Sequence, residues 1–127
     1  MHNFIRQCEQ AEEVQKLWKP KTYDYIGHKV LSYRDKYAIY RLDYKIDPKK
    51  FFWIPTRKQL QEMSGLSWWK FDERCNEIRR CLLEDPLSEI EIETKEEAGI
   101  CVVMEKYFKM WNGKNWEKET IVHKGGN

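Results

Sequence analysis

The residues that could do nucleophilic or metal chemistry are four cysteines and three histidines. No Cys-x-x-Cys pair occurs among Cys8, Cys75, Cys81 and Cys101, and the histidines are scattered along the chain. Zinc sites usually show paired ligands at close spacing. Cys75 and Cys81 are six residues apart, which directs them to different faces of one helix. The pattern therefore predicts reduced thiols that pack as small apolar side chains, with no metal site.

Other catalytic and cofactor patterns are also missing from the sequence. The six glycines are too dispersed for a phosphate-binding loop. The acidic segment Ser88–Glu97 lacks the alternation and the central glycine of a calcium loop. No nucleophile, base and orienting group stand in a known local arrangement. We therefore expect a non-catalytic chain without a cofactor, and we interpret the acidic segment as a solvated edge.

Length and charge limit the remaining classes. A chain of 127 residues predicts one domain, 1–127, with 120–127 as a frayed tail. No apolar run approaches the roughly 20 residues of a membrane helix, and the N-terminal residues lack the apolar core of a signal peptide. We expect a cytoplasmic protein with no membrane partner. The net charge of +2 is too small to mark a dedicated nucleic-acid binder.

The elements that must position any site begin with a helix and a sheet. Apolar residues recur at helical spacing over 3–18, and Pro20 ends this predicted helix. Alternating apolar and polar residues then predict two paired strands and a third short strand, at 28–34, 38–44 and 51–54. We expect a small antiparallel sheet of about three strands.

The second half of the chain predicts helices. Thr56–Gln59 fits a capping box that opens a helix ending at Gly65, and Ser67 can cap the helix that follows. Thr94–Glu97 fits a second capping box, whose helix would extend to Asn112-Gly113. The predicted fold class is α+β: an N-terminal helix, the small sheet, then a helix pair and a closing C-terminal helix packed on one face of it.

Two further predictions concern this half. Residues 88–93 alternate and could form a short edge strand. Gly99 weakens the closing helix and would allow another element to approach it closely.

The stretch Pro55–Arg74 resembles a helix-turn-helix unit, because two predicted helices are joined by a tight glycine turn. In that interpretation the phosphate contacts would be Arg57, Lys58, Lys70 and Arg74. Against it, the second helix presents Trp68 and Trp69 where DNA-reading residues usually lie. The same helix carries carboxylates that would repel phosphate, and a sheet precedes the pair. Simple packing of the two helices is the favoured interpretation.

Six tryptophans are the unusual feature of the composition. Most must be core in a chain of this length, and Trp116 can fold back to cover Trp111 after Asn112-Gly113. The alternative is an exposed aromatic patch for a protein partner, since Trp is over-represented among binding hot spots. The candidate partner contacts are Trp68, Trp69 and Trp116.

Three motifs together resemble a family of small uncharacterised proteins of bacteriophages and prophages. The motifs are LWKPKTYDYI at Leu17–Ile26, FWIPTRKQLQEM at Phe52–Met63 and MEKYFKMWNGKNWE at Met104–Glu117. Their order matches over about residues 13–118. Ile54 replaces the usual Leu, and residues 56–58 differ from the typical Arg-Gln-Asp type of sequence. The resemblance implies a phage or prophage context and a fold, and the family brings no established activity.

Two hypotheses follow. The first is a non-catalytic phage or prophage accessory protein that acts in the host cytosol through an unknown protein partner. It predicts a second helix pinned by its tryptophans and a surface of mixed sign. The alternative is a nucleic-acid-binding protein that uses the helix-turn-helix-like unit at 56–80. It predicts Lys70 and Arg74 exposed on one continuous positive face.

Overall fold

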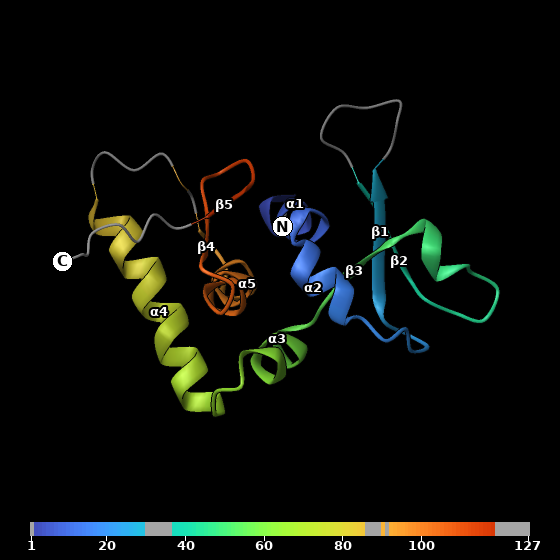
Figure 1. Cartoon of the computed structure of the whole chain (residues 1–127), viewed down its shortest axis with the longest axis horizontal. Helices are drawn as coiled ribbons and strands as arrows, with labels where there is room; N and C mark the ends of the chain where they lie inside the picture. Colours follow the sequence, from blue (N-terminus) through green and yellow to red (C-terminus); the bar gives the residue numbers. More distant parts are fainter. Residues whose placement is uncertain (1, 30–36, 86–89, 91, 119–127) are drawn as a thin grey trace.

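The computed structural model describes residues 2–29, 37–85, 90 and 92–118, and it has the predicted α+β architecture (Figure 1). None of the helices in these ranges has the length and apolar character needed to cross a membrane. In chain order the elements are α1 (His2–Gln10), α2 (Glu12–Leu17), β1 (Tyr25–Lys29), β2 (Tyr37–Arg41), the 3-10 turn η1 (Pro48–Lys50), β3 (Phe52–Ile54), α3 (Arg57–Ser64), α4 (Trp68–Glu84), α5 (Lys95–Glu105), β4 (Lys109–Trp111) and β5 (Trp116–Lys118).

The N-terminal helix predicted over 3–18 is divided in two at Ala11. This residue has φ −85° and ψ 78°, outside the helical region, and it is the N-cap of α2. The Gln15 side chain donates a hydrogen bond to the carbonyl oxygen of Cys8 at 2.9 Å, across the break. The apolar spacing continues through the break, because Phe4, Cys8, Ala11 and Val14 are all buried.

The first sheet has the strand order β2-β1-β3, and both pairings are antiparallel, as predicted. Strand β1 begins at Tyr25, earlier than expected, and most of the predicted partner strand 28–34 lies outside the described residues. Because β1 separates β2 from β3, the connection 42–51 must pass across β1. Leu42 is buried at its start, and the ring of Phe51 at its end lies 5.9 Å from the ring of Tyr40.

The outer edge of β3 is closed by a side chain. The Gln15 amide accepts a hydrogen bond from the Trp53 backbone N–H at 2.7 Å and donates one to the Trp53 carbonyl oxygen at 2.9 Å. This pair of bonds reproduces the pairing of a neighbouring strand. The Trp18 ring also stacks parallel to the Trp53 ring, with centroids 6.3 Å apart. Together these contacts attach α2 to the sheet.

Both predicted capping boxes are confirmed. In α3 the Thr56 hydroxyl accepts from the Gln59 N–H while the Gln59 side chain accepts from the Thr56 N–H. The same reciprocal bonds join Thr94 and Glu97 in α5. Gly65 ends α3 with φ +75°, in the left-handed region that favours glycine. Ser67 is the N-cap of α4 by position, although its side chain makes no capping hydrogen bond.

Helix α5 is the centre of the core. It is seen nearly end-on in Figure 1, between α4 on one side and α1 and α2 on the other. Its buried residues surround the helix, so that it packs against α1, α3 and α4. A Cβ added at Gly99 would lie 2.9 Å from a ring carbon of Phe71 and 3.3 Å from a methyl of Leu60. The glycine therefore permits the close approach that the sequence suggested.

The predicted extension of the closing helix to Asn112 is wrong. Helix α5 ends at Glu105, and Phe108 adopts φ +57°, which reverses the chain. Residues 109–111 then form β4, which pairs antiparallel with β5. Residues 112–115 form the hairpin loop between them, with Gly113 at φ +98° and the Asn112 side chain accepting from the backbone N–H groups of Lys114 and Asn115. Trp111 therefore lies in a strand rather than at a helix end.

The acidic segment that precedes α5 is described only in part. Residues 86–89 and 91 lie outside the described part of the chain, and residues 90, 92 and 93, the described part of the edge strand suggested at 88–93, are not in a strand. Ile92, which follows them, is buried in the core cluster.

Candidate functional site

Two tryptophans of α4 face solvent. Trp68 is 50% exposed and Trp69 is 62% exposed, whereas Phe71 and Cys75 form the buried face of the helix. The expectation that tryptophans pin this helix is therefore wrong. The residues that attach it to α5, Phe71 and Cys75, lie three and seven positions after Trp68, on the stripe of the helix that faces the core. The Trp68 ring also lies against the Phe71 ring, with centroids 6.1 Å apart.

Trp69 borders a shallow hollow on the outer face of α4. The hollow is lined by one aromatic ring and mainly acidic and polar side chains, namely Trp69, Asp72, Glu73, Asn76, Glu77 and Arg80. The Lys70 ammonium lies 5.9 Å from the centroid of the Trp69 ring. An exposed indole beside carboxylates can receive an apolar or cationic group from a partner.

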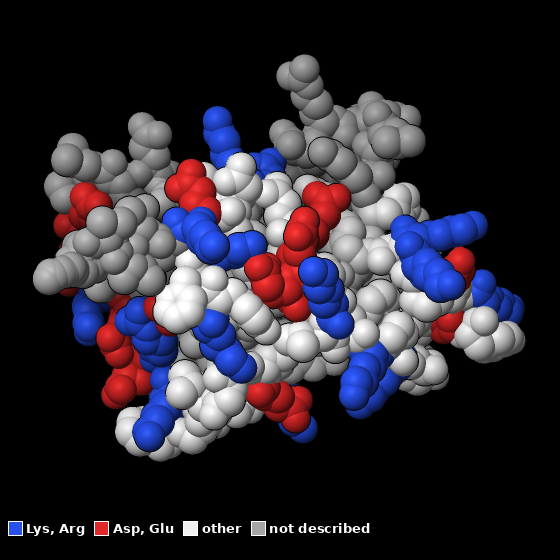
Figure 2. Space-filling view, viewed as in Figure 1, with Lys and Arg blue, Asp and Glu red and all other residues white. Residues whose placement is uncertain are grey.

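The basic residues predicted to contact nucleic acid do not share one environment. Arg57 in α3 forms an ion pair with Glu96 in α5 at 3.3 Å. Arg74 in α4 pairs with Glu105 and with Glu77, and its hydrogen bonds to Glu105 raise the pKa of Arg74. Lys58 and Lys70 are exposed. Figure 2 shows charges of both signs side by side in the region where Figure 1 places α3 and α4. The continuous positive surface expected of a nucleic-acid contact is therefore interrupted.

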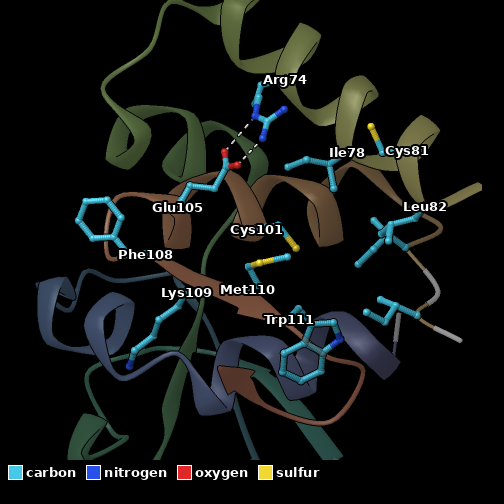
Figure 3. Close-up of a pocket in the computed structure, with 12 residues that line it drawn as sticks. Arg74, Ile78, Cys81, Leu82, Cys101, Glu105, Phe108, Lys109, Met110 and Trp111 are labelled. Atoms are coloured by element: carbon cyan, nitrogen blue, oxygen red, sulfur yellow. Dashed lines mark hydrogen bonds and ion pairs between the residues drawn. The ribbon is translucent and has the colours of Figure 1, made fainter. Parts of the chain in front are cut away.

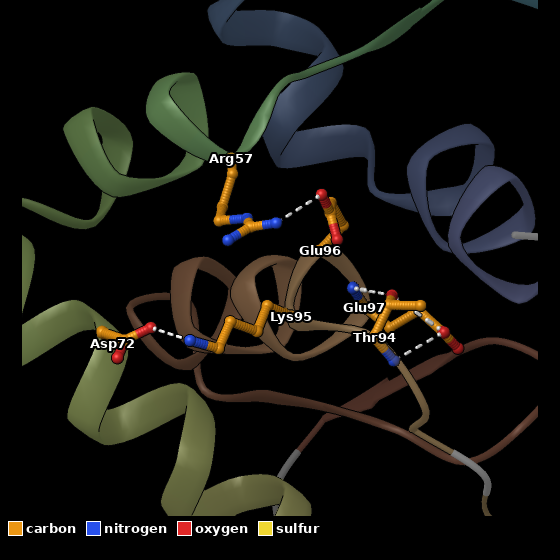
Figure 4. A network of polar contacts seen from close by, with 6 residues as sticks. All are labelled: Arg57, Asp72, Thr94, Lys95, Glu96 and Glu97. Carbon is orange, nitrogen blue, oxygen red and sulfur yellow. Dashed lines mark hydrogen bonds and ion pairs between the residues drawn. The ribbon is translucent and has the colours of Figure 1, made fainter.

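Ion pairs connect the helices that carry these residues. Figure 4 shows Arg57 reaching Glu96 across the α3–α5 interface and Lys95 reaching Asp72 of α4 at 2.8 Å. Both α3 and α4 pack mainly on α5 rather than on each other. A helix-turn-helix unit keeps its own small core between its two helices. Here the two helices use α5 as the common support.

A cavity of about 440 Å³ lies between α4, α5 and β4 (Figure 3). Its walls are mostly apolar, and they are formed by Ile78, Leu82, Ile90, Ile92, Cys101, Phe108, Met110 and Trp111 together with Cys81. The Arg74–Glu105 ion pair lies at one end, as Figure 3 shows. Lys109, the other cation of the wall, is paired with Glu13 at 2.6 Å.

Two buried thiols, Cys101 in the wall of this cavity and Cys75 on the core face of α4, are poor nucleophiles. Burial raises the pKa of Cys101 to about 12 and that of Cys75 to about 11, so both are protonated at neutral pH. Burial also raises the pKa of Cys8. Within the described residues no cluster of three or more His, Cys, Asp or Glu side chains could hold a metal ion. The cavity can accommodate an apolar group, and the charged side chains of its wall, Arg74, Glu105 and Lys109, are each paired with a charge of opposite sign.

Trp116 is not grouped with the other two candidate contacts. Its ring is half-buried against Trp111, with centroids 5.1 Å apart, as the sequence suggested. Its indole N–H donates to the carbonyl oxygen of Gln7 at 3.0 Å, which ties β5 to α1. Trp116 therefore closes the core, while Trp68 and Trp69 remain on the outer surface.

Comparison with protein-family models, with curated proteins and with solved structures finds no match to this chain. The candidate sites therefore have to be argued from their own geometry. Sequence patterns did not reveal the cavity, because its walls come from three elements whose arrangement depends on the turn at Phe108.

Proposed function

We propose that this chain is a non-catalytic accessory protein of phage or prophage type, which acts in the host cytosol by binding another protein. The centre of the contact is the pair Trp68 and Trp69. The observation that carries the proposal is their exposure, 50% and 62%, in the first turn of the longest helix. Large aromatic side chains of this kind dominate the energetics of protein interfaces.

The surroundings of the pair support a protein contact. The hollow beside Trp69 contains Asp72, Glu73 and Glu77, with Arg80 at its border. A central aromatic anchor with a polar and charged border is the usual composition of a protein interface. The thiols of Cys75 and Cys101 have raised pKa values, which supports a role that does not involve a reactive thiolate.

The phage context rests on the three motifs. Their tryptophans, Trp18, Trp53, Trp111 and Trp116, are buried or half-buried in this fold. Trp68 and Trp69 lie outside those motifs. We interpret the motifs as the signature of the shared core, and the exposed pair as a surface feature added to it. The nucleic-acid alternative at 56–80 is less well supported, because Arg57 and Arg74 are held by carboxylates.

Site-specific photocrosslinking in cells that express the protein tests the proposal. A benzophenone amino acid replaces Trp69, and a matched control carries it at the exposed Tyr23, which precedes β1. We expect a discrete crosslinked protein at position 69 that is lost when Trp68→Ala is added. The proposal fails if position 69 gives no discrete product, or if both positions give the same products. Sedimentation of the purified chain shows whether the partner is a second copy.

A further inference from the structure

Positive charge is concentrated around the sheet. We call residues 18–54 the sheet half and residues 55–118 the helical half. The sheet half has nine Lys or Arg and four Asp, with no Glu, whereas the helical half has eleven Lys or Arg and thirteen Asp or Glu. In Figure 2 blue predominates over the right-hand part of the molecule, where Figure 1 places β1, β2 and η1. This excess favours an anionic partner for the sheet half.

Cations of the sheet half lie against aromatic rings. The Arg41 guanidinium is 4.7 Å from the centroid of the Tyr25 ring and donates to the Tyr25 hydroxyl at 2.6 Å. The Lys45 ammonium is 5.7 Å from the centroid of the Tyr44 ring. Lys49 and Lys50 are exposed on η1. Among the described residues these four cations form no ion pair with a carboxylate, so their charge is available to a ligand.

Residues 40–51 contain two acidic side chains, Asp43 and Asp47, and each is held by a local turn. Asp43 accepts from the Lys45 backbone N–H at 2.8 Å, and Asp47 accepts from the Lys49 backbone N–H at 3.0 Å. Each carboxylate shapes the turn that presents the next lysine.

Exposed aromatic rings are interleaved with these cations. Tyr44 is 89% exposed and Tyr40 is 45% exposed, and the Tyr40 ring stacks parallel to the His28 ring with centroids 5.6 Å apart. Phe51 meets both rings edge-on, at 5.4 Å from His28 and 5.9 Å from Tyr40. The buried Leu42 anchors the segment between the two exposed tyrosines. The Tyr40 ring is therefore held by His28 and Phe51, and the Tyr44 ring is the more accessible of the two.

We propose that the segment 40–51 of the sheet half is a binding surface for single-stranded nucleic acid. Bases stack on the rings of Tyr44 and Tyr40, and phosphates contact Arg41, Lys45, Lys49 and Lys50. Unpaired bases offer the flat faces that such rings bind, and a positive surface follows the backbone. A duplex keeps its bases stacked on one another and cannot use the tyrosines. This surface is separate from Trp68 and Trp69, and it does not depend on the proposed protein contact.

Fluorescence anisotropy with the full chain tests the inference. The probes are fluorescein-labelled oligothymidylate and oligouridylate of roughly 20 nucleotides, and a mixed-sequence duplex of the same length. We expect micromolar binding of a single strand at low salt and weaker binding of the duplex. Four engaged cations would reduce the single-strand affinity about 50-fold between roughly 50 and 200 mM salt, because counterions are released on binding.

Two variants separate stacking from charge. Tyr44→Ala should weaken single-strand binding about tenfold without changing the salt dependence, because a stacking contact is lost. The triple variant Lys45→Ala, Lys49→Ala, Lys50→Ala should weaken binding and lower the magnitude of the salt slope by about 2. The matched control replaces three exposed lysines of the helical half by alanine: Lys58, Lys70 and Lys114. Circular dichroism confirms that each variant is folded.

Four outcomes would overturn the inference. They are no single-strand binding at low salt, equal affinity for the duplex, an equal loss in the control triple variant, and unchanged binding by Tyr44→Ala. Vesicles containing phosphatidylserine provide a further comparison. If they bind the chain while both oligonucleotides do not, the positive charge serves a lipid surface and the inference is wrong.

Discussion

In the helical half Arg57, Arg74 and Lys95 each contact a carboxylate of a neighbouring helix, whereas in the sheet half Arg41 and Lys45 lie against tyrosine rings. A carboxylate neutralises a cation, and an aromatic ring only orients it. These three charges of the helical half therefore serve the assembly of α3, α4 and α5. Those of the sheet half are left to attract an anion from outside the molecule.

The exposed aromatic rings of the two halves have neighbours of opposite charge. In the helical half the exposed rings of Trp68 and Trp69 stand beside carboxylates, which suits an apolar or cationic protein group. In the sheet half the exposed rings of Tyr40 and Tyr44 stand among lysines and Arg41. Net charge alone, at +2, conceals this division. The four predictions that follow test which contacts hold the helices and the sheet in place.

The largest effect is expected where α4 meets α5. Phe71→Ala should lower the free energy of unfolding by about 3–5 kcal/mol, because it removes a buried ring from the Gly99 contact and leaves a cavity. Trp69→Ala, two residues away, should change it by less than about 1 kcal/mol, since that ring faces solvent. Urea denaturation measures both. Equal losses would mean that Trp69 is part of the core, and would remove the basis for a partner surface.

The next effect concerns the attachment of the sheet. Gln15→Ala should lower the free energy of unfolding by about 2–3 kcal/mol, because the backbone N–H and carbonyl of Trp53 lose their partners. Hydrogen exchange of the Trp53 amide should become faster. Lys16→Ala, at the exposed neighbouring position, is the control and should stay within about 0.5 kcal/mol. An unchanged Trp53 exchange rate would contradict the closed edge.

A smaller effect is expected from the ion pair on α4. A double-mutant cycle with Arg74→Ala and Glu105→Ala should give a coupling free energy of about 1 kcal/mol or less, because both side chains are partly exposed. The coupling should decrease as salt rises. A coupling well above this value would indicate that charge, rather than the Phe71 contact, holds α4 to α5.

The smallest effect is a pH dependence at the pair of Glu13 and Lys109. Burial raises the pKa of Glu13, but the hydrogen bond and charge of Lys109 outweigh it and hold the pKa below its ordinary value of 4.5. Because the folded pKa is depressed, this stabilisation is present above pH 4.5 and is lost as the pH falls through the folded pKa. Lys109→Met should make the acid loss of stability shallower in urea titrations at several pH values. An unchanged slope would mean that groups other than Glu13 and Lys109 cause the loss of stability in acid.

Local signals in the sequence predicted much of the fold. The capping boxes at Thr56 and Thr94 and the short strand β3 are set by side chains close to one another in the chain. The end of α5 was missed because a phenylalanine, rather than a glycine, adopts the left-handed conformation at position 108. The dipeptide Asn112-Gly113 was then assigned to a helix end instead of to a hairpin.

The candidate surfaces were harder to predict than the elements. Trp68 and Trp69 were named from the sequence, but their exposure depends on which face of α4 meets α5, and Phe71 and Cys75 decide that. Ion pairing of Arg57 and Arg74 depends on carboxylates 39 and 31 residues away in the chain. The cations of the sheet half belong to no sequence motif, and the placement of Arg41 beside the Tyr25 ring depends on the pairing of β1 with β2.

The contact between Gln15 and Trp53 has a consequence for how the chain is made. An open strand edge is a template on which another chain can pair and begin to aggregate. Gln15 occupies the groups that Trp53 would offer on that edge. Since synthesis proceeds from the N-terminus, the glutamine has already been added when β3 leaves the ribosome. The edge of β3 can therefore pair with Gln15 of its own chain as soon as it forms, and this single amide side chain protects the edge from pairing with another chain.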